Sequence, residues 1–312
     1  MIIFAIIVFL YLGLFLRRPK SAASYKDSPT RTVSFIGFIV LWAWVTKALA
    51  EPGYDIVIVA GQSNSVCSGL GDFIDPGNHQ ELTSKIDQVS QDFKIVPTVG
   101  ESTAAKHECL QDYGYHPDRA ATGFGLAFAE QYAANQLASD RRVLVVPAGC
   151  GGTSILSWLG EWENPELSCA ATPRNLPSRL LKKVQVGMAG PGAHKVVAFL
   201  WAQGETDLAF SINQKQPMSV DAYRIALWRW FYRVRKTWPG NYPIITTRLS
   251  PDWLKNVGIK QQFENAISDV CRSDVFCKTA YTGGLKANDD EVHLNAQSKI
   301  LLGIMMYTLA YK

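Results

Sequence analysis

The residues best placed to carry out chemistry are a serine near one end of the chain and an aspartate–histidine pair near the other. Ser63 stands two residues after Gly61, which ends the apolar run Asp55–Ala60. Asp290 and His293 stand three residues apart, so one turn of chain can bring the carboxylate to the imidazole ring. A hydroxyl, an imidazole and a carboxylate are the groups that a hydrolase triad requires. These residues are therefore our candidate triad.

The segments between these residues predict a parallel sheet flanked by helices, because short apolar runs alternate with runs of helical periodicity. The expected strands are Asp55–Ala60, Arg142–Ala148, Lys195–Trp201, Tyr242–Thr247 and a weaker one near Val275–Tyr281. The expected helices are Gly123–Ala138, Pro177–Met188, Val220–Trp238, Ile259–Cys271 and Ala296–Tyr311. Two segments rich in Gly, Pro, Asp and Asn, Gly69–Gln111 and Leu156–Leu176, are expected to be long loops that shape the binding site.

Four polar blocks follow an expected strand or precede the last expected helix. They are Gly61–Ser65, Gly149–Ile155, Gln203–Asp207 and Asp290–His293. Open α/β folds bind ligands at the carboxyl edge of the sheet, and the first three blocks follow strands that end there. We therefore expect the candidate site at that edge.

In order and content the blocks resemble the SGNH (GDSL-like) hydrolase superfamily, in its sialate O-acetylesterase and plant acetylxylan-esterase-like branch. That branch has GQSN, GGT-x-I, W-x-QGE-x-D and D-x-x-H blocks, which stand here as Gly61–Asn64, Gly151–Ile155, Trp201–Asp207 and Asp290–His293. The resemblance covers nearly all of the chain after Asp55. It implies an esterase domain over residues 51–312 with an α/β fold, a three-layer α/β/α sandwich whose mostly parallel sheet has about five strands.

The same resemblance implies a Ser-His-Asp hydrolase that acts on acyl esters, commonly O-acetyl groups on sugars, with no cofactor. Ser63 matches the nucleophile, and His293 matches the general base that takes its proton and later protonates the leaving alcohol. Asp290 matches the carboxylate that orients the imidazole. The neighbouring Asp289 and Glu291 have the wrong spacing, and we expect them to face solvent.

The oxyanion hole implied by the resemblance has three candidate donors. They are the backbone N–H of Ser63, the backbone N–H of Gly152 (with Gly151 as the alternative) and the side-chain amide of Gln203. A glycine suits this role because the backbone must approach the ester closely. The two acidic residues of the third block are expected to hold its loop and not to transfer protons.

Each of these residues also has a purely structural interpretation. Ser63 could cap a helix, His293 could be an ordinary helix-start residue, and Gln203 could satisfy buried backbone groups. Gly151–Gly152 could be only a turn at a strand end. The α/β-hydrolase fold is a weaker match, because the chain lacks the second glycine of the Gly-x-Ser-x-Gly elbow.

The six cysteines are an even number, which suits disulfides in an oxidising compartment. They are Cys67, Cys109, Cys150, Cys169, Cys271 and Cys277. Cys271 and Cys277 are the first pair to test, since a short loop could join them. Cys150 stands in the second block and is interpreted as a packing residue, because no other histidine motif could serve it as a nucleophile.

Three further features carry weaker predictions. Trp158 and Trp162 could stack on a sugar ring or simply pack. No metal site is expected, because His107, Cys109 and His116 have no second ligand pair at finger-like spacing. The net charge of +4 is mild and no basic stripe carries interleaved aromatics, so nucleic acid is not an expected partner.

The first fifty residues differ in kind from the rest. Ile2–Leu16 and Val33–Thr46 are apolar, each shorter than the roughly 20 residues that span a bilayer comfortably, and a basic linker joins them. They are either membrane-anchoring segments or, for the second run, a signal peptide with Ala48–Ala50 as its cleavage site. Both readings place the rest of the chain on the lumenal or extracellular side, membrane-anchored or secreted.

The chain is thus expected to be a serine esterase that removes O-acetyl groups from a carbohydrate through an acyl-serine intermediate. Two alternatives remain open. The first is an acyltransferase or lipid esterase with the same triad. The second is a sugar-binding module that keeps the fold without turnover.

Overall fold

The computed structural model describes residues 53–66, 69–70, 84–90, 93–97, 121–161, 175–213 and 218–312. The chain divides into two units, Met1–Ala48 and Leu49–Lys312, and every described residue belongs to the second. The predicted membrane or signal segments, Trp162 and the 107–116 cluster lie outside the described residues. None of the helices in the described part is both long and apolar enough to cross a membrane.

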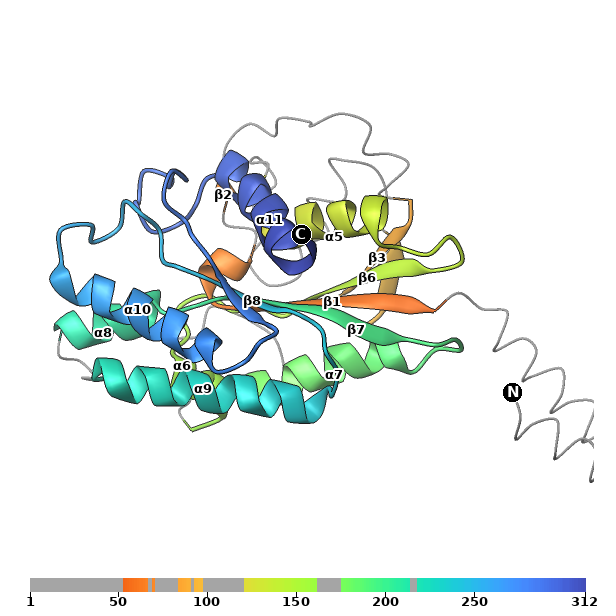
Figure 1. The fold of residues 1–312 in the computed structure, drawn as a ribbon, viewed down its shortest axis with the longest axis horizontal. Coiled ribbons are helices and arrows are strands. Elements are labelled where there is room, and N and C mark those ends of the chain that lie inside the picture. Colours follow the sequence, from red (N-terminus) through yellow and green to blue (C-terminus); the bar gives the residue numbers. More distant parts are fainter. Residues whose placement is uncertain are drawn as a thin grey trace, which may run out of the picture. The chain divides into compact units, whose positions relative to one another are not determined.

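A seven-stranded sheet lies at the centre of the fold, in the order β4-β3-β6-β1-β7-β8-β9 (Figure 1). The strands are β1 (Tyr54–Gly61), β3 (Ile86–Val89), β4 (Ile95–Pro97), β6 (Arg142–Pro147), β7 (Lys195–Ala202), β8 (Ile244–Thr247) and β9 (Cys277–Ala280). Neighbouring strands are parallel except for β3 and β4. A separate antiparallel pair is formed by β2 (Gly69–Leu70) and β5 (Ala121–Thr122).

Strand β1 leads to Ser63 and is buried on both faces, between β6 and β7. Both faces of a doubly covered parallel strand are apolar, which explains why the sequence shows an unbroken β-branched run instead of alternation. Val57, for example, lies opposite Val145 on one side and Ala198 on the other. The chain therefore delivers Ser63 to the middle of the sheet's carboxyl edge.

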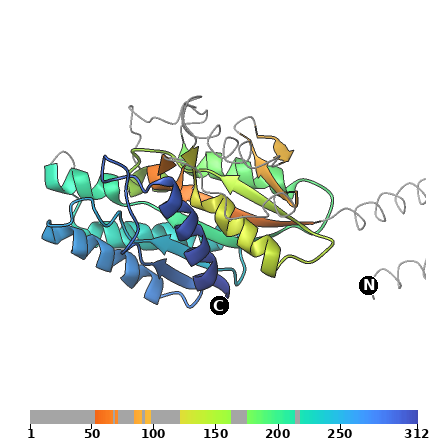
Figure 2. The same ribbon diagram turned by 90° about the horizontal axis from the view of Figure 1, so that it is seen from above.

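Helices cover both faces of the sheet, so the predicted three-layer α/β/α fold is confirmed (Figures 1 and 2). The helices are α5 (Phe124–Asn135), α6 (Ile155–Leu159), α7 (Leu176–Met188), α8 (Glu205–Asn213), α9 (Val220–Thr237), α10 (Gly258–Arg272) and α11 (Ala296–Tyr311). Helices α5 and α11 pack on one face, and α7, α9 and α10 pack on the other. One apolar core fills each interface.

The predicted count of about five strands was too low, because β3 and β4 lie in a segment expected to be a loop. Strand β3 has the sequence Ile-Asp-Gln-Val, which carries no apolar run. Its buried Asp87 accepts two hydrogen bonds from Arg142 at 2.7 and 2.8 Å and one from the Tyr54 hydroxyl at 2.8 Å. Partners remote in sequence therefore allow this polar segment to enter the sheet.

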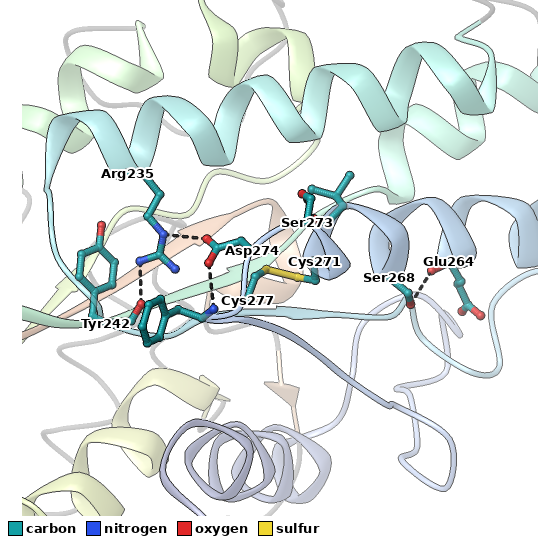
Figure 3. The surroundings of a disulfide bond; sticks show 10 residues. Arg235, Tyr242, Glu264, Ser268, Cys271, Ser273, Asp274 and Cys277 are labelled. Carbon is teal, nitrogen blue, oxygen red and sulfur yellow. Dashed lines mark hydrogen bonds and ion pairs between the residues drawn. A yellow bond between two sulfur atoms is a disulfide. The ribbon is translucent and has the colours of Figure 1, made fainter.

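A disulfide joins Cys271 at the end of α10 to Cys277 at the start of β9, as predicted (Figure 3). The turn between them is held by Asp274, whose Oδ2 accepts a hydrogen bond from Arg235 Nε at 2.8 Å. Arg235 also donates to the Tyr242 carbonyl at 2.6 Å. Cys150 is buried and disulfide-bonded as well, so its interpretation as a packing residue was wrong.

Candidate active site

Ser63 begins a single 3-10 turn, Ser63–Ser65, directly beyond β1. Gly61 has a φ of +127°, and a Cβ there would lie 2.1 Å from the Ala202 carbonyl oxygen, so only glycine fits. The Gln62 N–H donates to the same carbonyl at 2.8 Å. Gln62, and not Ser63, occupies the N-cap position, so the helix-cap interpretation of Ser63 finds no support.

The Asp290 carboxylate is bound to His293 at both its ring and its backbone. His293 Nδ1 lies 2.6 Å from Asp290 Oδ2, and the N–H groups of Val292 and His293 donate to Asp290 Oδ1 at 3.0 and 2.9 Å. Partial burial raises the pKa of Asp290, but the hydrogen bonds and the nearby imidazole outweigh it and lower that pKa below its ordinary value. The carboxylate therefore stays ionised and can orient the ring.

The first and fourth blocks meet at Asn64, the residue after Ser63. Asn64 Nδ2 donates to the Val292 carbonyl at 3.0 Å, and the Leu294 N–H donates to Asn64 Oδ1 at 3.1 Å. His293 lies between these two partners in the chain. The structure thus places the Ser63 turn beside the loop that carries the aspartate–histidine pair.

Lys299 of α11 fixes the same turn from below. Its side chain is fully buried, and its Nζ donates to the carbonyl oxygens of Asn64 and Val66 at 2.5 and 2.8 Å. A buried ammonium is costly unless its hydrogen bonds are made, and here carbonyl groups of the turn make them. The last helix is therefore attached directly to the backbone around Ser63.

Gly152 of the second block is exposed and has a φ of +68°. Within the described part of the chain, its N–H makes no hydrogen bond. The block itself is tied to the first one, since the Cys150 N–H donates to the Gly61 carbonyl at 2.9 Å. Gly152 can therefore present an N–H at the carboxyl edge, which favours it over Gly151 as an oxyanion donor.

The Gln203 side chain connects the second and third blocks. Its amide nitrogen donates to the Thr153 carbonyl at 3.1 Å and to the Asp207 carboxylate. Those bonds account for both of its N–H groups, so a role as an oxyanion donor would require one of them to be given up. The bond to Thr153 matches the structural interpretation of Gln203.

Asp207 gathers three donors at the buried end of α8. Besides Gln203, it accepts from the Ser154 hydroxyl at 2.5 Å and from the Ile155 N–H at 3.0 Å. Burial raises its pKa from 3.8 to about 6, and these hydrogen bonds hold the rise in check. Asp207 therefore holds the two loops together, as expected, and nothing in its contacts gives it a reacting group.

Other predicted positions fall into place as follows. Asp289 and Glu291 are exposed, as expected. Trp158 is fully buried against Trp201 and Trp230, with ring centroids 5.1 and 5.5 Å away, so it packs and cannot stack on a sugar. Across the described ranges, no three His, Cys, Asp or Glu side chains are grouped to hold a metal ion.

The sequence analysis missed the roles of Asn64 and Lys299. Asn64 stands inside the GQSN block, so its place beside Ser63 was a usable signal. Lys299 carried none, because a lysine in a helix is ordinarily exposed.

Comparisons with known proteins agree with this fold. A protein of Arabidopsis thaliana of known structure superposes with a TM-score of 0.60 and 21% identity, covering 83% of this chain and 98% of its own. The acetylxylan esterase Axe2 of Geobacillus stearothermophilus gives 0.45 and 12%, covering 83% and 95%. The protein NanS gives 0.48 and 14%, covering 84% and 99%. A search of curated proteins found no match.

The match that decides the family is to a sequence family. The family model described as "Carbohydrate esterase, sialic acid-specific acetylesterase" matches residues 53–312, the whole region that carries the four blocks. Members of such a family are carboxylic ester hydrolases, in agreement with the site built above. The chain belongs to this family of carbohydrate esterases.

Proposed function

We propose that the chain is a serine esterase that removes O-acetyl groups from a carbohydrate through an acetyl-Ser63 intermediate. The observation that supports it most is the pair of hydrogen bonds from Asn64 to the residues on either side of His293, at 3.0 and 3.1 Å. They bring the turn of the nucleophile to the loop of the base. Family membership supplies the class of ester.

In this mechanism the Ser63 oxygen attacks the acetyl carbon while its proton passes to His293 Nε2. The tetrahedral oxyanion accepts hydrogen bonds from the N–H groups of Ser63 and Gly152. Collapse breaks the ester bond, and the imidazolium returns the proton to the leaving sugar hydroxyl. Water then attacks the acetyl-serine in the same way and releases acetate. Asp290 stays ionised throughout, and it fixes the ring and stabilises its protonated form.

The test is acetate release from O-acetylated sialic acid and from acetylated xylo-oligosaccharides, with wild-type full chain beside Ser63→Ala. We expect loss of turnover in the variant, while Ser178→Ala, an exposed serine of α7, keeps wild-type activity. Mass spectrometry of the wild type should find acetate on the peptide that contains Ser63. Turnover by Ser63→Ala would refute the proposal.

The same assay separates the alternatives that the sequence left open. Transfer of acetyl to an added sugar faster than to water would indicate an acyltransferase. Faster hydrolysis of long-chain esters than of acetates would indicate a lipid esterase. Glycan binding without release of any acyl group would indicate a binding module.

We further propose that the esterase domain resides on the lumenal or extracellular side, attached to a membrane or released by signal cleavage through residues 1–50. Two disulfide-bonded positions, Cys271–Cys277 and Cys150, support this, because disulfides persist mainly in oxidising compartments. Protease protection in intact vesicles tests the side. N-terminal sequencing of the purified protein distinguishes an anchor from a cleaved signal.

A further inference from the structure

We propose that Asn64 and Glu205 form a positioning pair that holds His293 in register with Ser63. This inference rests on the proposed function, because it assigns two residues to the alignment of that triad. Neither residue touches the reacting atoms in the mechanism above. Both act through the loop that carries the base.

The first step is that Asn64 uses all of its amide for this purpose. Its Oδ1 accepts from the Leu294 N–H at 3.1 Å, and its Nδ2 donates to the Val292 carbonyl at 3.0 Å and to Glu205 Oε1 at 2.7 Å. The first two bonds hold the backbone immediately before and after His293. A side chain that holds the chain on both sides of a histidine limits how far its ring can shift.

The second step is that Glu205 decides which way the amide faces. A carboxylate oxygen only accepts hydrogen bonds, so Glu205 Oε1 requires Asn64 to present its Nδ2. The Asn64 oxygen must then face the Leu294 N–H, which is the one arrangement in which all three bonds form. Glu205 is 4% exposed and lies in the first turn of α8, where a negative charge is stabilised.

The third step is that the base of Asn64 cannot move. Lys299 Nζ holds the Asn64 carbonyl at 2.5 Å, and Asn64 directly follows the nucleophile in the turn. The pair therefore connects two rigid points, the Ser63 backbone and α8, to the half-exposed loop of His293. Misplacement of a catalytic group by about 1 Å can cost about 10²-fold in rate.

The test measures how fast a fluorophosphonate probe labels Ser63 in the purified full chain, a reaction that requires the base but not the natural sugar. We expect Asn64→Ala and Asn64→Asp to slow labelling about 10²-fold. Glu205→Gln should slow it about three- to tenfold, because an amide no longer dictates the direction of Asn64. Asn175→Ala is the matched control, since it removes an asparagine cap from α7 far along the chain and should label at the wild-type rate.

The double variant Asn64→Asp with Glu205→Gln separates positioning from damage to the fold. Asn64→Asp alone sets two carboxylates against each other. With Glu205→Gln, a donor and an acceptor face each other again, and we expect recovery of about tenfold over Asn64→Asp. Two independent structural defects would instead slow labelling additively. This comparison also decides the matter if Asn64→Ala fails to fold.

Labelling of Asn64→Ala at the wild-type rate, or no recovery in the double variant, would overturn the inference. So would a wild type whose Ser63 does not react with the probe. A wild type that is labelled at Ser63, shows the predicted pattern of variants and yet releases no acetate from sugars would leave the positioning pair in place. In that case the proposed function alone would fail.

Discussion

Two aspartates at the carboxyl edge of the sheet have opposite environments. Asp207 is 1% exposed, and burial raises its pKa to about 6. Asp290 has 47% of its side chain exposed, and hydrogen bonds from the His293 loop lower its pKa. Asp207 binds groups that do not move in the mechanism, namely Gln203, Ser154 and a backbone N–H. Asp290 binds the one group that changes its charge.

The difference shows how this edge divides its work. The side of the oxyanion hole is a buried, densely bonded framework, where a carboxylate is kept for geometry at the expense of burying it. The side of the base is a half-exposed loop, where solvent and three N–H donors keep a carboxylate ionised. An ionised carboxylate beside the ring is what general-base catalysis by His293 requires.

The largest effect that this comparison predicts is for Asp290→Asn. The amide cannot stabilise the imidazolium or hold the same tautomer, and the same change in a serine protease triad lowers kcat by about 10⁴. We expect a loss of that size in kcat for an acetylated sugar, with KM little changed. Asp289→Asn, an exposed carboxylate one residue earlier, should keep wild-type kinetics. Equal losses in both variants would mean that Asp290 has no special role.

The next effect is for Asp207→Asn. Its amide nitrogen would face the donors Gln203 Nε2 and Ile155 N–H, so the second and third blocks should separate. We expect kcat to fall about 10²-fold, the loss that follows from one misplaced oxyanion donor. Steady-state kinetics on the same acetylated sugar measure it. An unchanged kcat would show that the hole does not depend on this framework.

The two aspartates should also differ in how they couple folding to pH. Asp207 binds its proton more tightly when folded, so its contribution to the free energy of unfolding falls as pH rises from about 4 to about 6. Asp290 has a lowered pKa, so its contribution is present above its ordinary value of 3.8 and is lost as pH falls through the lower folded value.

Urea unfolding across this pH range, on wild type and each Asp→Asn variant, measures both slopes. The difference between wild type and Asp207→Asn should change by about 2 kcal/mol between pH 4 and 7. Parallel curves for wild type and Asp207→Asn would contradict the burial of an ionised group there.

The smallest effect is for Gly152→Ala. No atom lies within 4 Å of the added Cβ, and the N–H is kept, so the cost is the left-handed backbone alone, about 1 kcal/mol of stability. We expect a slightly lower Tm and kcat within about threefold of wild type. A loss as large as that of Asp207→Asn would show that the Cβ blocks the ester.

Local patterns predicted the parts of the fold that local forces determine. The runs that became β1, β6 and β7 are apolar because both faces of a parallel strand are covered. The 16-residue helix Ala296–Tyr311 has the predicted bounds. The Cys271–Cys277 bond follows from a short turn. These features need no knowledge of distant residues.

The features that were missed depend on partners far along the chain. Strand β3 is a strand because Arg142 neutralises Asp87, 55 residues away. Gln203 was a candidate oxyanion donor until its bonds to Thr153 and Asp207 were seen. Asn64 meets Leu294 across 230 residues. No spacing rule predicts such a meeting, because only the folded sheet brings the two segments to one edge.

Lys299 has a consequence for how the enzyme is made. It is translated 235 residues after Asn64, yet it holds the carbonyl oxygens of the turn that carries Ser63. A nascent chain that has produced every strand but not α11 has the sheet and no finished nucleophile turn. We therefore expect the ribosome to release a chain whose reactive serine is assembled among its last folding events, so that incomplete products are inactive.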